Sequence, residues 1–355
     1  MPGKLIQKVA NFLKKENIPT TPTGMDNQEF IDFWYQKVLK RKPETDVNKY
    51  YKKALESGEV TREEIIIRLI NSEEFRPLRV NKEFVPPGHF YSAIPSQKER
   101  EAFLAEDLSG IDEIPGVNLN IQKQVDLLNQ FKQYYEECPF PDNKTEQFRY
   151  YYLNPAYSYG DALTLYGMMR HFKPKRIIEM GSGFSSCAML DTNDHFFGGE
   201  IEFTFVEPYP ELLYSLIQAG DEKNVILPQG VQAVDKGIFD GLEANDILFV
   251  DSTHVSKLNS DVNRIIFEIL ASLRKGVVIH FHDIFWPFEY PKSWIREGRA
   301  WNEAYILRAF LEFNESFEIL FFADYLNQFQ HDWFQKNMPL YLKNSGGNIW
   351  MQKVK

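Results

Sequence analysis

The segment that most constrains the fold is residues 176–186, with the sequence RIIEMGSGFSS. It opens with a short apolar run that follows a proline and ends in a Gly-Ser-Gly turn, which is typical of a buried strand rather than a helix. The two glycines allow backbone angles that are closed to other residues, and they leave room for a ligand beside the chain. Good helix formers follow, with two serines that can cap the first turn. A strand, a glycine turn and a helix start predict a nucleotide-type ligand site at the carboxyl end of the strand.

Length and composition narrow the class of protein. A chain of 355 residues can hold one large α/β domain and a smaller unit. Its formal net charge of −10 argues against a nucleic-acid binder, which presents a basic face. Cys138 and Cys187 lie far apart in segments of different kinds, which indicates a reducing, cytoplasmic setting without disulfides. No apolar run approaches the roughly 18 residues that span a bilayer, and no signal-peptide pattern opens the chain.

The sequence divides into four expected parts. Residues 1–25 form an N-terminal segment with a basic amphipathic start, which either packs on its own protein or touches an anionic membrane surface. Residues 26–77 show helical spacing of apolar side chains, with a capping box at Thr61 and Glu64. Residues 78–118 are rich in proline and predict a connector, and residues 119–355 predict the α/β domain.

Acids and histidines follow three further strands at their carboxyl ends. Glu207 closes the strand after the glycine turn, where an acid can accept hydrogen bonds from ribose hydroxyls. The next buried strand ends in Asp251, with His254 three residues beyond, and a later strand runs into His282 and Asp283. Strands that alternate with helices predict a parallel sheet, and ligands gather beyond its carboxyl ends. We therefore expect these side chains to converge.

Aromatic residues gather near the same strand ends. The segment 148–159 includes Tyr157 and Tyr159, and the segment 285–291 includes Trp286 and Tyr290. Such rings can form a stacking surface for an acceptor molecule. A hydrophobic cover over the sheet edge explains them nearly as well.

Two family resemblances rest on these motifs. The series IIEMGSGFSS, FVEP, DILFVDSTH and HFHD resembles the class I S-adenosylmethionine-dependent methyltransferases, closest to the branch of bacterial sugar and natural-product O-methyltransferases. This resemblance covers about residues 121–355 and implies a Rossmann-like sheet, mostly parallel, with the last strand antiparallel. Residues 30–75 resemble the small helical DUF4214 domain through the LxR-x-P turn, the S-G-x-x-T-R-E-E step and the closing S-x-E-F, although the family's glycine after the proline is absent.

The methyltransferase resemblance implies roles for single residues. The residues implied to bind S-adenosylmethionine are Glu179, Gly181, Ser182 and Gly183 at the methionine part, Glu207 at the ribose, Gln232 near the adenine, and Asp251. Some relatives bind a divalent cation through an acid at the fourth strand and an acid pair at the fifth. Asp251 and Asp283 match that pattern, while His282 stands in the third position, which favours a softer ion than Mg²⁺.

The resemblance implies methyl transfer to a hydroxyl of a small or glycosyl acceptor. A neutral alcohol is a poor nucleophile, so it needs a base such as His254, beside Asp251, or a cation that acidifies the hydroxyl. The unperturbed pKa of histidine, near 6.5, suits that task. One alternative is a nicotinamide-dependent oxidoreductase, which the missing third glycine disfavours. The other is a non-catalytic S-adenosylmethionine-binding assembly protein. The helical domain predicts a docking partner, and a homo-oligomer is a further expectation.

Overall fold

The computed structural model describes residues 24–70, 72, 74 and 84–355. Its contacts divide the chain into two compact units, with the boundary between Ala93 and Ile94. Each unit has its own hydrophobic core. All but the last two residues of the expected N-terminal segment 1–25 lie outside the described residues.

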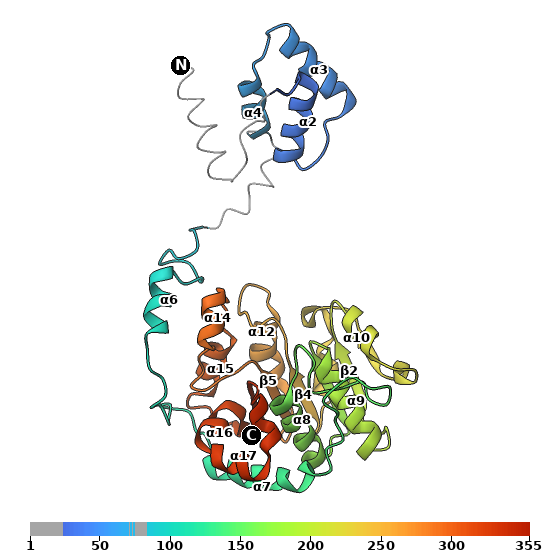
Figure 1. The fold of residues 1–355 in the computed structure, drawn as a ribbon, viewed down its shortest axis with the longest axis vertical. Coiled ribbons are helices and arrows are strands. Elements are labelled where there is room, and N and C mark those ends of the chain that lie inside the picture. Colours follow the sequence, from blue (N-terminus) through green and yellow to red (C-terminus); the bar gives the residue numbers. More distant parts are fainter. Residues whose placement is uncertain (1–23, 71, 73, 75–83) are drawn as a thin grey trace. The chain divides into compact units, whose positions relative to one another are not determined.

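The described part of the smaller unit contains three helices, α2 (Asn27–Val38), α3 (Thr45–Glu56) and α4 (Arg62–Ile70) (Figure 1). They pack around Trp34, which is fully buried. The predicted capping box begins α4, since Glu64 N–H donates to Thr61 Oγ1 at 3.2 Å and Thr61 N–H donates to a Glu64 carboxylate oxygen at 2.9 Å. The helical spacing read from residues 26–77 is therefore present in the described part of that segment.

The larger unit is built on one sheet of seven strands in the order β3-β2-β1-β4-β5-β7-β6. The strands are β1 (Arg176–Met180), β2 (Glu202–Val206), β3 (Val225–Leu227), β4 (Ile247–Val250), β5 (Val278–His282), β6 (Phe317–Phe322) and β7 (Asn348–Lys353). The first five run parallel, and β7 inserts antiparallel between β5 and β6. The predicted fold class is confirmed.

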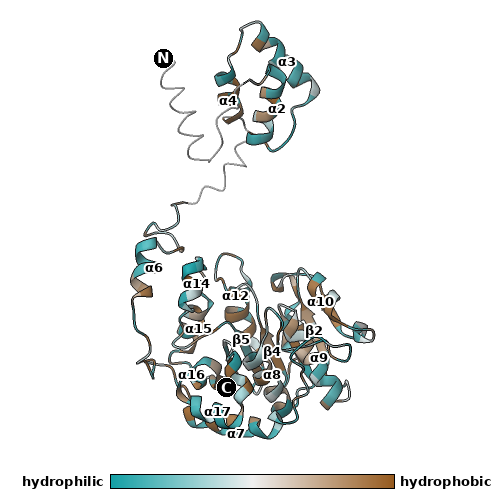
Figure 2. Cartoon of the chain, in the orientation of Figure 1, coloured by the Kyte–Doolittle hydropathy of each residue, from teal (hydrophilic) through white to brown (hydrophobic). Residues whose placement is uncertain are grey.

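Helices cover this sheet and connect its strands, apart from α6 (Gln97–Leu104), which precedes the strands and contacts α14 (Lys292–Glu297) (Figure 1). Their bounds are α6 (Gln97–Leu104), α7 (Ile121–Tyr135), α8 (Tyr159–Phe172), α9 (Phe184–Phe196), α10 (Glu211–Leu216), α11 (Lys236–Asp240), α12 (Asp261–Arg264), α13 (Leu270–Ser272), α14 (Lys292–Glu297), α15 (Glu303–Leu311), α16 (Ala323–Phe329) and α17 (His331–Asn337). A π-helical turn, Ile265–Ile269, joins α12 to α13. Most residues of α8 are buried, whereas α3, which Figure 2 shows mostly in hydrophilic colours, buries Ala54.

Two elements reach the edge of the sheet where the strand-end residues lie. The first is α8, which begins at Tyr159. The second is β5, which runs through His282. The register explains the end of β5, because His282 pairs with Asn348 of β7 in the antiparallel ladder. His282 is therefore held rigidly in the sheet.

Part of the predicted connector packs on the larger unit. Lys292 donates to the Glu106 carbonyl at 2.5 Å, and the Trp286 indole donates to the Ile111 carbonyl at 2.8 Å. Phe313 N–H donates to the Gly116 carbonyl at 2.7 Å. Residues 94–118 therefore belong to the compact unit that carries the sheet. Among the described residues, no helix combines the length and apolar character that crossing a bilayer requires.

Candidate functional site

The glycine loop after β1 lies against the end of β4. Gly181 has a φ of +84°, and a Cβ on it would stand 1.6 Å from the Asp251 carbonyl oxygen. Gly183 differs, because its φ of −179° is open to any residue and a Cβ there would have Leu212 Cδ2 as its nearest neighbour, at 3.5 Å. Gly181 is thus required by the fold of the loop, whereas Gly183 leaves open space beside it.

Two cavities flank this loop. One, of about 190 Å³, is lined by Ala156, Tyr157, Gly181, Ser182, Gly183, Phe184, Ser185, Glu207, Leu212 and Asp251. The other, of about 350 Å³, is lined by Met180, Gly181, Val206, Glu207, Pro208, Tyr209, Gly230, Val231, Gln232, Asp251, Ser252, Thr253 and Asp261. Gly181, Glu207 and Asp251 line both cavities. Six of the seven residues predicted to bind the cofactor, all except Glu179, are thus gathered around one loop.

A wider cavity, of about 640 Å³, lies elsewhere on the larger unit. Its lining includes Glu315, Glu318 and Lys355. Lys355 pairs with Glu315 at 2.7 Å, and Glu318 pairs with Lys123 at 2.7 Å. Because its charged groups are exposed and already paired, we place the chemistry at the glycine loop and not here.

Glu207 lines both cavities, at the position expected of an acid that binds ribose hydroxyls. One of its carboxylate oxygens accepts the Ser182 N–H at 3.1 Å, and the other accepts the Tyr209 N–H at 2.8 Å. A carboxylate offers about four acceptor positions, so two remain for a pair of ligand hydroxyls. The residues present therefore fit a nucleoside-type cofactor.

Glu179 lies one layer below the loop and lines neither cavity. It is fully buried, and its carboxylate accepts hydrogen bonds from the hydroxyls of Ser185, at 2.5 Å, and Ser186. Burial raises the pKa of Glu179 to about 8, against the opposing effect of these serines. Glu179 would therefore affect a cofactor electrostatically, or by orienting Ser185 and Ser186, which donate to it.

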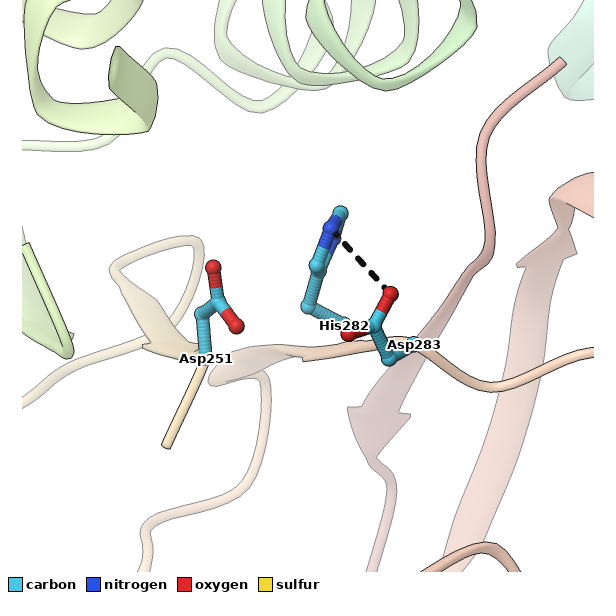
Figure 3. Close-up of side chains that lie close together, drawn as sticks. All are labelled: Asp251, His282 and Asp283. Atoms are coloured by element: carbon cyan, nitrogen blue, oxygen red, sulfur yellow. Dashed lines mark ion pairs between the residues drawn. The ribbon is translucent and has the colours of Figure 1, made fainter. Parts of the chain in front are cut away.

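The carboxyl ends of β4 and β5 bring Asp251, His282 and Asp283 together (Figure 3). Each offers a ligand atom, and these atoms all lie within 4.8 Å of one another. His282 directs its ring toward the acids, with Nε2 3.6 Å from Asp283 Oδ1. Asp283 has a φ of +56°, which a residue with a side chain adopts only where its surroundings hold it. Two carboxylates and an imidazole are a donor set that fits a divalent cation.

His254 reaches the same acids from the loop after β4. Its Nε2 lies 3.5 Å from Asp251 Oδ1 and 3.4 Å from Asp283 Oδ2, and its Nδ1 lies 2.8 Å from a Glu303 carboxylate oxygen. Burial alone would lower the pKa of His254, but Asp251, Glu303 and Asp283 together raise it to about 10. The three carboxylates around the ring thus move the pKa of His254 above the unperturbed value near 6.5.

Glu303, at the start of α15, is a site residue that the sequence argument missed. Glu303 is 1% exposed. In addition to the side-chain contact, the backbone N–H groups of Glu303 and Asn302 both donate to the His254 carbonyl at 3.1 Å. These bonds hold His254 in a left-handed conformation with a φ of +58°. The sequence signal that could have identified Glu303 is an acid in the first turn of a mostly apolar helix.

The aromatic residues predicted to bind an acceptor separate into two groups. Tyr157 lines the smaller cavity, and its ring lies 5.3 Å from that of His282. Tyr159 instead stacks on Tyr152 at 4.5 Å and donates to Asp142 at 2.8 Å. The structure therefore brings only Tyr157 of this pair to the strand ends.

The second aromatic segment packs mainly into the protein. Trp286 is 4% exposed, and its ring lies 4.9 Å from that of Tyr325. Tyr290 is equally buried and accepts the Ala304 N–H at 3.1 Å. The ring that contacts His254 is that of Trp301, at 4.5 Å. Its indole is partly exposed, so it is better placed than Trp286 or Tyr290 to meet an acceptor.

Comparisons with known proteins agree with this architecture. A family model described as a methyltransferase domain matches residues 178–284, and the domain of unknown function DUF4214 matches residues 10–78. An uncharacterized protein of Archaeoglobus fulgidus is 34% identical over 181 residues, which are 49% of this chain and 81% of that protein.

Two solved structures are similar at low sequence identity. The O-methyltransferase TomG from Streptomyces achromogenes, in complex with SAM, is 12% identical with a TM-score of 0.34, covering 65% of this chain and 90% of that chain. A DUF574 family protein from Streptomyces avermitilis is 13% identical with a TM-score of 0.32, covering 55% and 80%. The methyltransferase family match itself contains the glycine loop, Glu207 and the strand-end acids and histidines. Residues 178–284 therefore belong to a methyltransferase domain, and a DUF4214 domain matches the chain ahead of it, at residues 10–78.

Proposed function

We propose that this enzyme transfers a methyl group to a hydroxyl of a small or glycosyl acceptor, with His254 as the base. One observation carries the proposal: Asp251 lines both cavities of the glycine loop and also faces His254 and the other strand-end acid. The cofactor-type loop and the acid–histidine cluster are therefore parts of one site.

The loop residues position the two reactants. S-adenosylmethionine supplies a methyl group on a sulfonium, which is already a strong electrophile. The protein therefore contributes mainly alignment, by holding the acceptor oxygen in line with that methyl group. Gly183 and Tyr157 line the smaller cavity, and Glu207 has free acceptor positions for hydroxyls. These residues fix one reactant beside Asp251.

His254 is positioned to take the proton that the acceptor loses. Glu303 accepts from Nδ1, so Nε2 is the nitrogen that faces Asp251 and Asp283. Proton abstraction needs the neutral ring, while the surrounding acids favour the charged one. A divalent cation at Asp251, His282 and Asp283 would offset that negative charge and supply Lewis acidity at the hydroxyl.

The surroundings of His254 support an acceptor with a flat apolar face or a sugar ring. Trp301 lies against His254, and the Arg299 guanidinium sits 4.9 Å from the Trp301 ring. Aromatic faces bind the apolar faces of rings, and the arginine adds hydrogen-bond donors at the edge. This wall supports a hydroxylated ring compound as the acceptor class.

The test is methyl transfer from radiolabelled S-adenosylmethionine to a panel of sugars, nucleotide sugars and catechols, with and without added divalent ions. We expect label in a hydroxyl-bearing product and its loss in His254→Ala. Calorimetry with S-adenosylhomocysteine checks that the variant still binds the cofactor product. Binding of NADH with no binding of S-adenosylmethionine would instead support the oxidoreductase alternative. Cofactor binding without transfer to any acceptor would support the non-catalytic alternative.

A further inference from the structure

Behind the strand-end acids lies a buried carboxylate that the proposed function does not use, Asp161 of α8. Its side chain is 6% exposed. Its Oδ1 accepts the side-chain amide of Asn348 at 2.7 Å and the Gly347 N–H at 3.2 Å. The same oxygen lies 3.9 Å from Nδ1 of His282. A carboxylate buried this deeply is costly unless polar groups surround it, and Asn348, Gly347 and His282 supply them.

The loop before β7 is shaped around this carboxylate. A Cβ on Gly346 would stand 2.0 Å from Asp161 Oδ1, and Gly346 adopts a φ of +70°. On the other side, a Cβ on Gly160 would stand 2.3 Å from the Ser345 carbonyl oxygen. Two glycines thus allow the loop and the helix to close around Asp161. The fold holds this acid in one place beside His282.

His282 is oriented between two sets of oxygens. Its ring is buried, and Nδ1 has no hydrogen-bond partner within normal distance, so the nearby Asp161 oxygen is the acceptor available to it. The opposite nitrogen, Nε2, faces Asp283 (Figure 3). Histidines that bind metals usually donate their other ring N–H to a carboxylate, which fixes the tautomer and the ring orientation. Asp161 Oδ1 lies 3.9 Å from His282 Nδ1, which is longer than a hydrogen bond, so Asp161 faces that nitrogen as a buried carboxylate without a direct hydrogen bond to it.

More acidic than basic side chains surround the strand-end cluster of Asp251, His282 and Asp283. Asp161, Asp251, Asp283 and Glu303 surround His254 and His282, and the described ion pairs of these four acids involve only the two histidines. Acidic side chains therefore outnumber the basic ones at this cluster, and positive charge placed there would be stabilised. A divalent cation supplies that charge.

We propose that Asp161 fixes His282 as the imidazole ligand of a cation site completed by Asp251 and Asp283, and that this site prefers a divalent first-row transition ion to Mg²⁺. Mg²⁺ favours an all-oxygen shell with several waters. Imidazole nitrogen favours Mn²⁺, Fe²⁺, Co²⁺ or Zn²⁺, in the order of increasing affinity for nitrogen ligands. The inference rests on the proposed function only for the location of the site, because ion binding is measured without methyl transfer.

The first experiment uses the full-length, untagged protein after chelation and dialysis. Calorimetry with Mn²⁺, Co²⁺ and Mg²⁺ measures the preference, and pulsed electron paramagnetic resonance of bound Mn²⁺ detects a directly coordinated imidazole nitrogen. We expect Mn²⁺ and Co²⁺ to bind more tightly than Mg²⁺, with a nitrogen signal in the Mn²⁺ spectrum. Equal or tighter Mg²⁺ binding, an all-oxygen Mn²⁺ spectrum, or no binding of any ion overturns the proposal.

Three variants separate the roles. His282→Asn should remove the nitrogen signal and the preference for Co²⁺, and Asp161→Asn should weaken Mn²⁺ affinity by about 10- to 100-fold, the usual effect of losing such a partner. His331→Asn, at an exposed histidine of α17, is the matched control and should bind ions as the wild type does. Full Mn²⁺ affinity in Asp161→Asn contradicts the role of Asp161. If Asp161→Asn does not fold, the nitrogen signal of the wild type still decides the ligand set.

Calorimetry with S-adenosylhomocysteine keeps this inference apart from the proposed function. Cofactor binding that persists while no ion binds overturns the cation site and leaves methyl transfer standing. Ion binding without cofactor binding supports the cation site and overturns the proposed methyl transfer.

Discussion

His254 and His282 approach the same two acids, and each has a buried carboxylate at its other nitrogen. Glu303 lies 2.8 Å from His254 Nδ1, and Asp161 lies 3.9 Å from His282 Nδ1. The hydrogen bond to Glu303 fixes which nitrogen of His254 faces Asp251 and Asp283, whereas Asp161 lies beyond hydrogen-bond distance of His282. The Glu303 contact is the shorter of the two, which suits the proposed role of His254 as a base that keeps one tautomer.

Substitutions at these positions should affect turnover and binding differently. We expect His254→Ala to lower turnover by about 10² to 10⁴, the usual range for loss of a general base. Asp251→Asn and Asp283→Asn should reduce methyl transfer far more than S-adenosylhomocysteine affinity. Single-turnover assays with calorimetry on the same preparations measure both quantities. Unchanged turnover of His254→Ala between pH 6 and 9 would remove the base from the mechanism.

Glu179 should make the stability of the larger unit depend on pH. Its pKa is raised to about 8 in the folded protein, whereas an exposed glutamate titrates near its ordinary value of about 4.3. The folded state therefore holds the extra proton, so its stabilising contribution is full below about pH 4.3 and is lost as pH rises to about 8. The slope within that window is at most about 1.4 kcal/mol per pH unit.

Urea unfolding of wild type and Glu179→Gln at pH 5, 6.5 and 8 measures this dependence. We expect the stability of the wild type to fall with rising pH relative to the variant, because glutamine stays neutral. Parallel curves for the two proteins would show that Glu179 is ionised throughout.

At the scale of elements, the glycine turn offers a matched pair of substitutions. Gly181→Val should prevent the loop from packing, because its Cβ would collide with the Asp251 carbonyl oxygen and its φ is positive. Gly183→Ala should fold normally, since its Cβ meets only an ordinary contact at 3.5 Å, and should weaken cofactor binding by occupying cavity space. Thermal unfolding and S-adenosylhomocysteine calorimetry distinguish the two effects. A folded Gly181→Val protein with wild-type affinity would contradict this account of the loop.

The sequence predicted those parts of the site that follow from local pattern. Glu207, Asp251 and the His282–Asp283 pair come directly at strand ends, so alternating strands and helices were sufficient to bring them to one edge. Glu303 and Asp161 were missed because they come from helices distant in sequence, and only tertiary packing places them behind the histidines. Trp286 and Tyr290 were predicted as acceptor contacts because aromatic composition does not say which face of a segment is buried.

At the scale of the molecule, residues 94–118 determine where the methyltransferase unit can be separated. A chain beginning at Ile94 should keep its fold and cofactor binding, since the contacts of Glu106, Ile111 and Gly116 remain. A chain beginning at residue 119 should melt at a lower temperature, because the Trp286 indole loses its partner. Differential scanning calorimetry compares the two. Equal melting temperatures would mean that the segment is a passive connector, as the proline content first suggested.

The DUF4214 domain remains proposed as a docking module, with its own three-helix core. The chain beginning at Ile94 provides the test for that role too. It should keep methyl transfer to a free acceptor while losing association with a partner that binds the full chain. Loss of cofactor binding in the shortened chain would instead make the helical domain part of the catalytic unit.

The position of β7 has a consequence for how the protein is made. This strand follows all the others in sequence, yet it lies between β5 and β6 and supplies Asn348, while the loop before it supplies Gly347. During synthesis, β5 and β6 therefore leave the ribosome before β7. The edges of β5 and β6 that pair with β7 stay unpaired until that last strand inserts between them. Asp161 and His282, already synthesised, acquire their final neighbours in that same event. Assembly of the chemical site and closure of the sheet are thus one late step, and a nascent chain stalled before β7 would be inactive, with two edges open to aggregation.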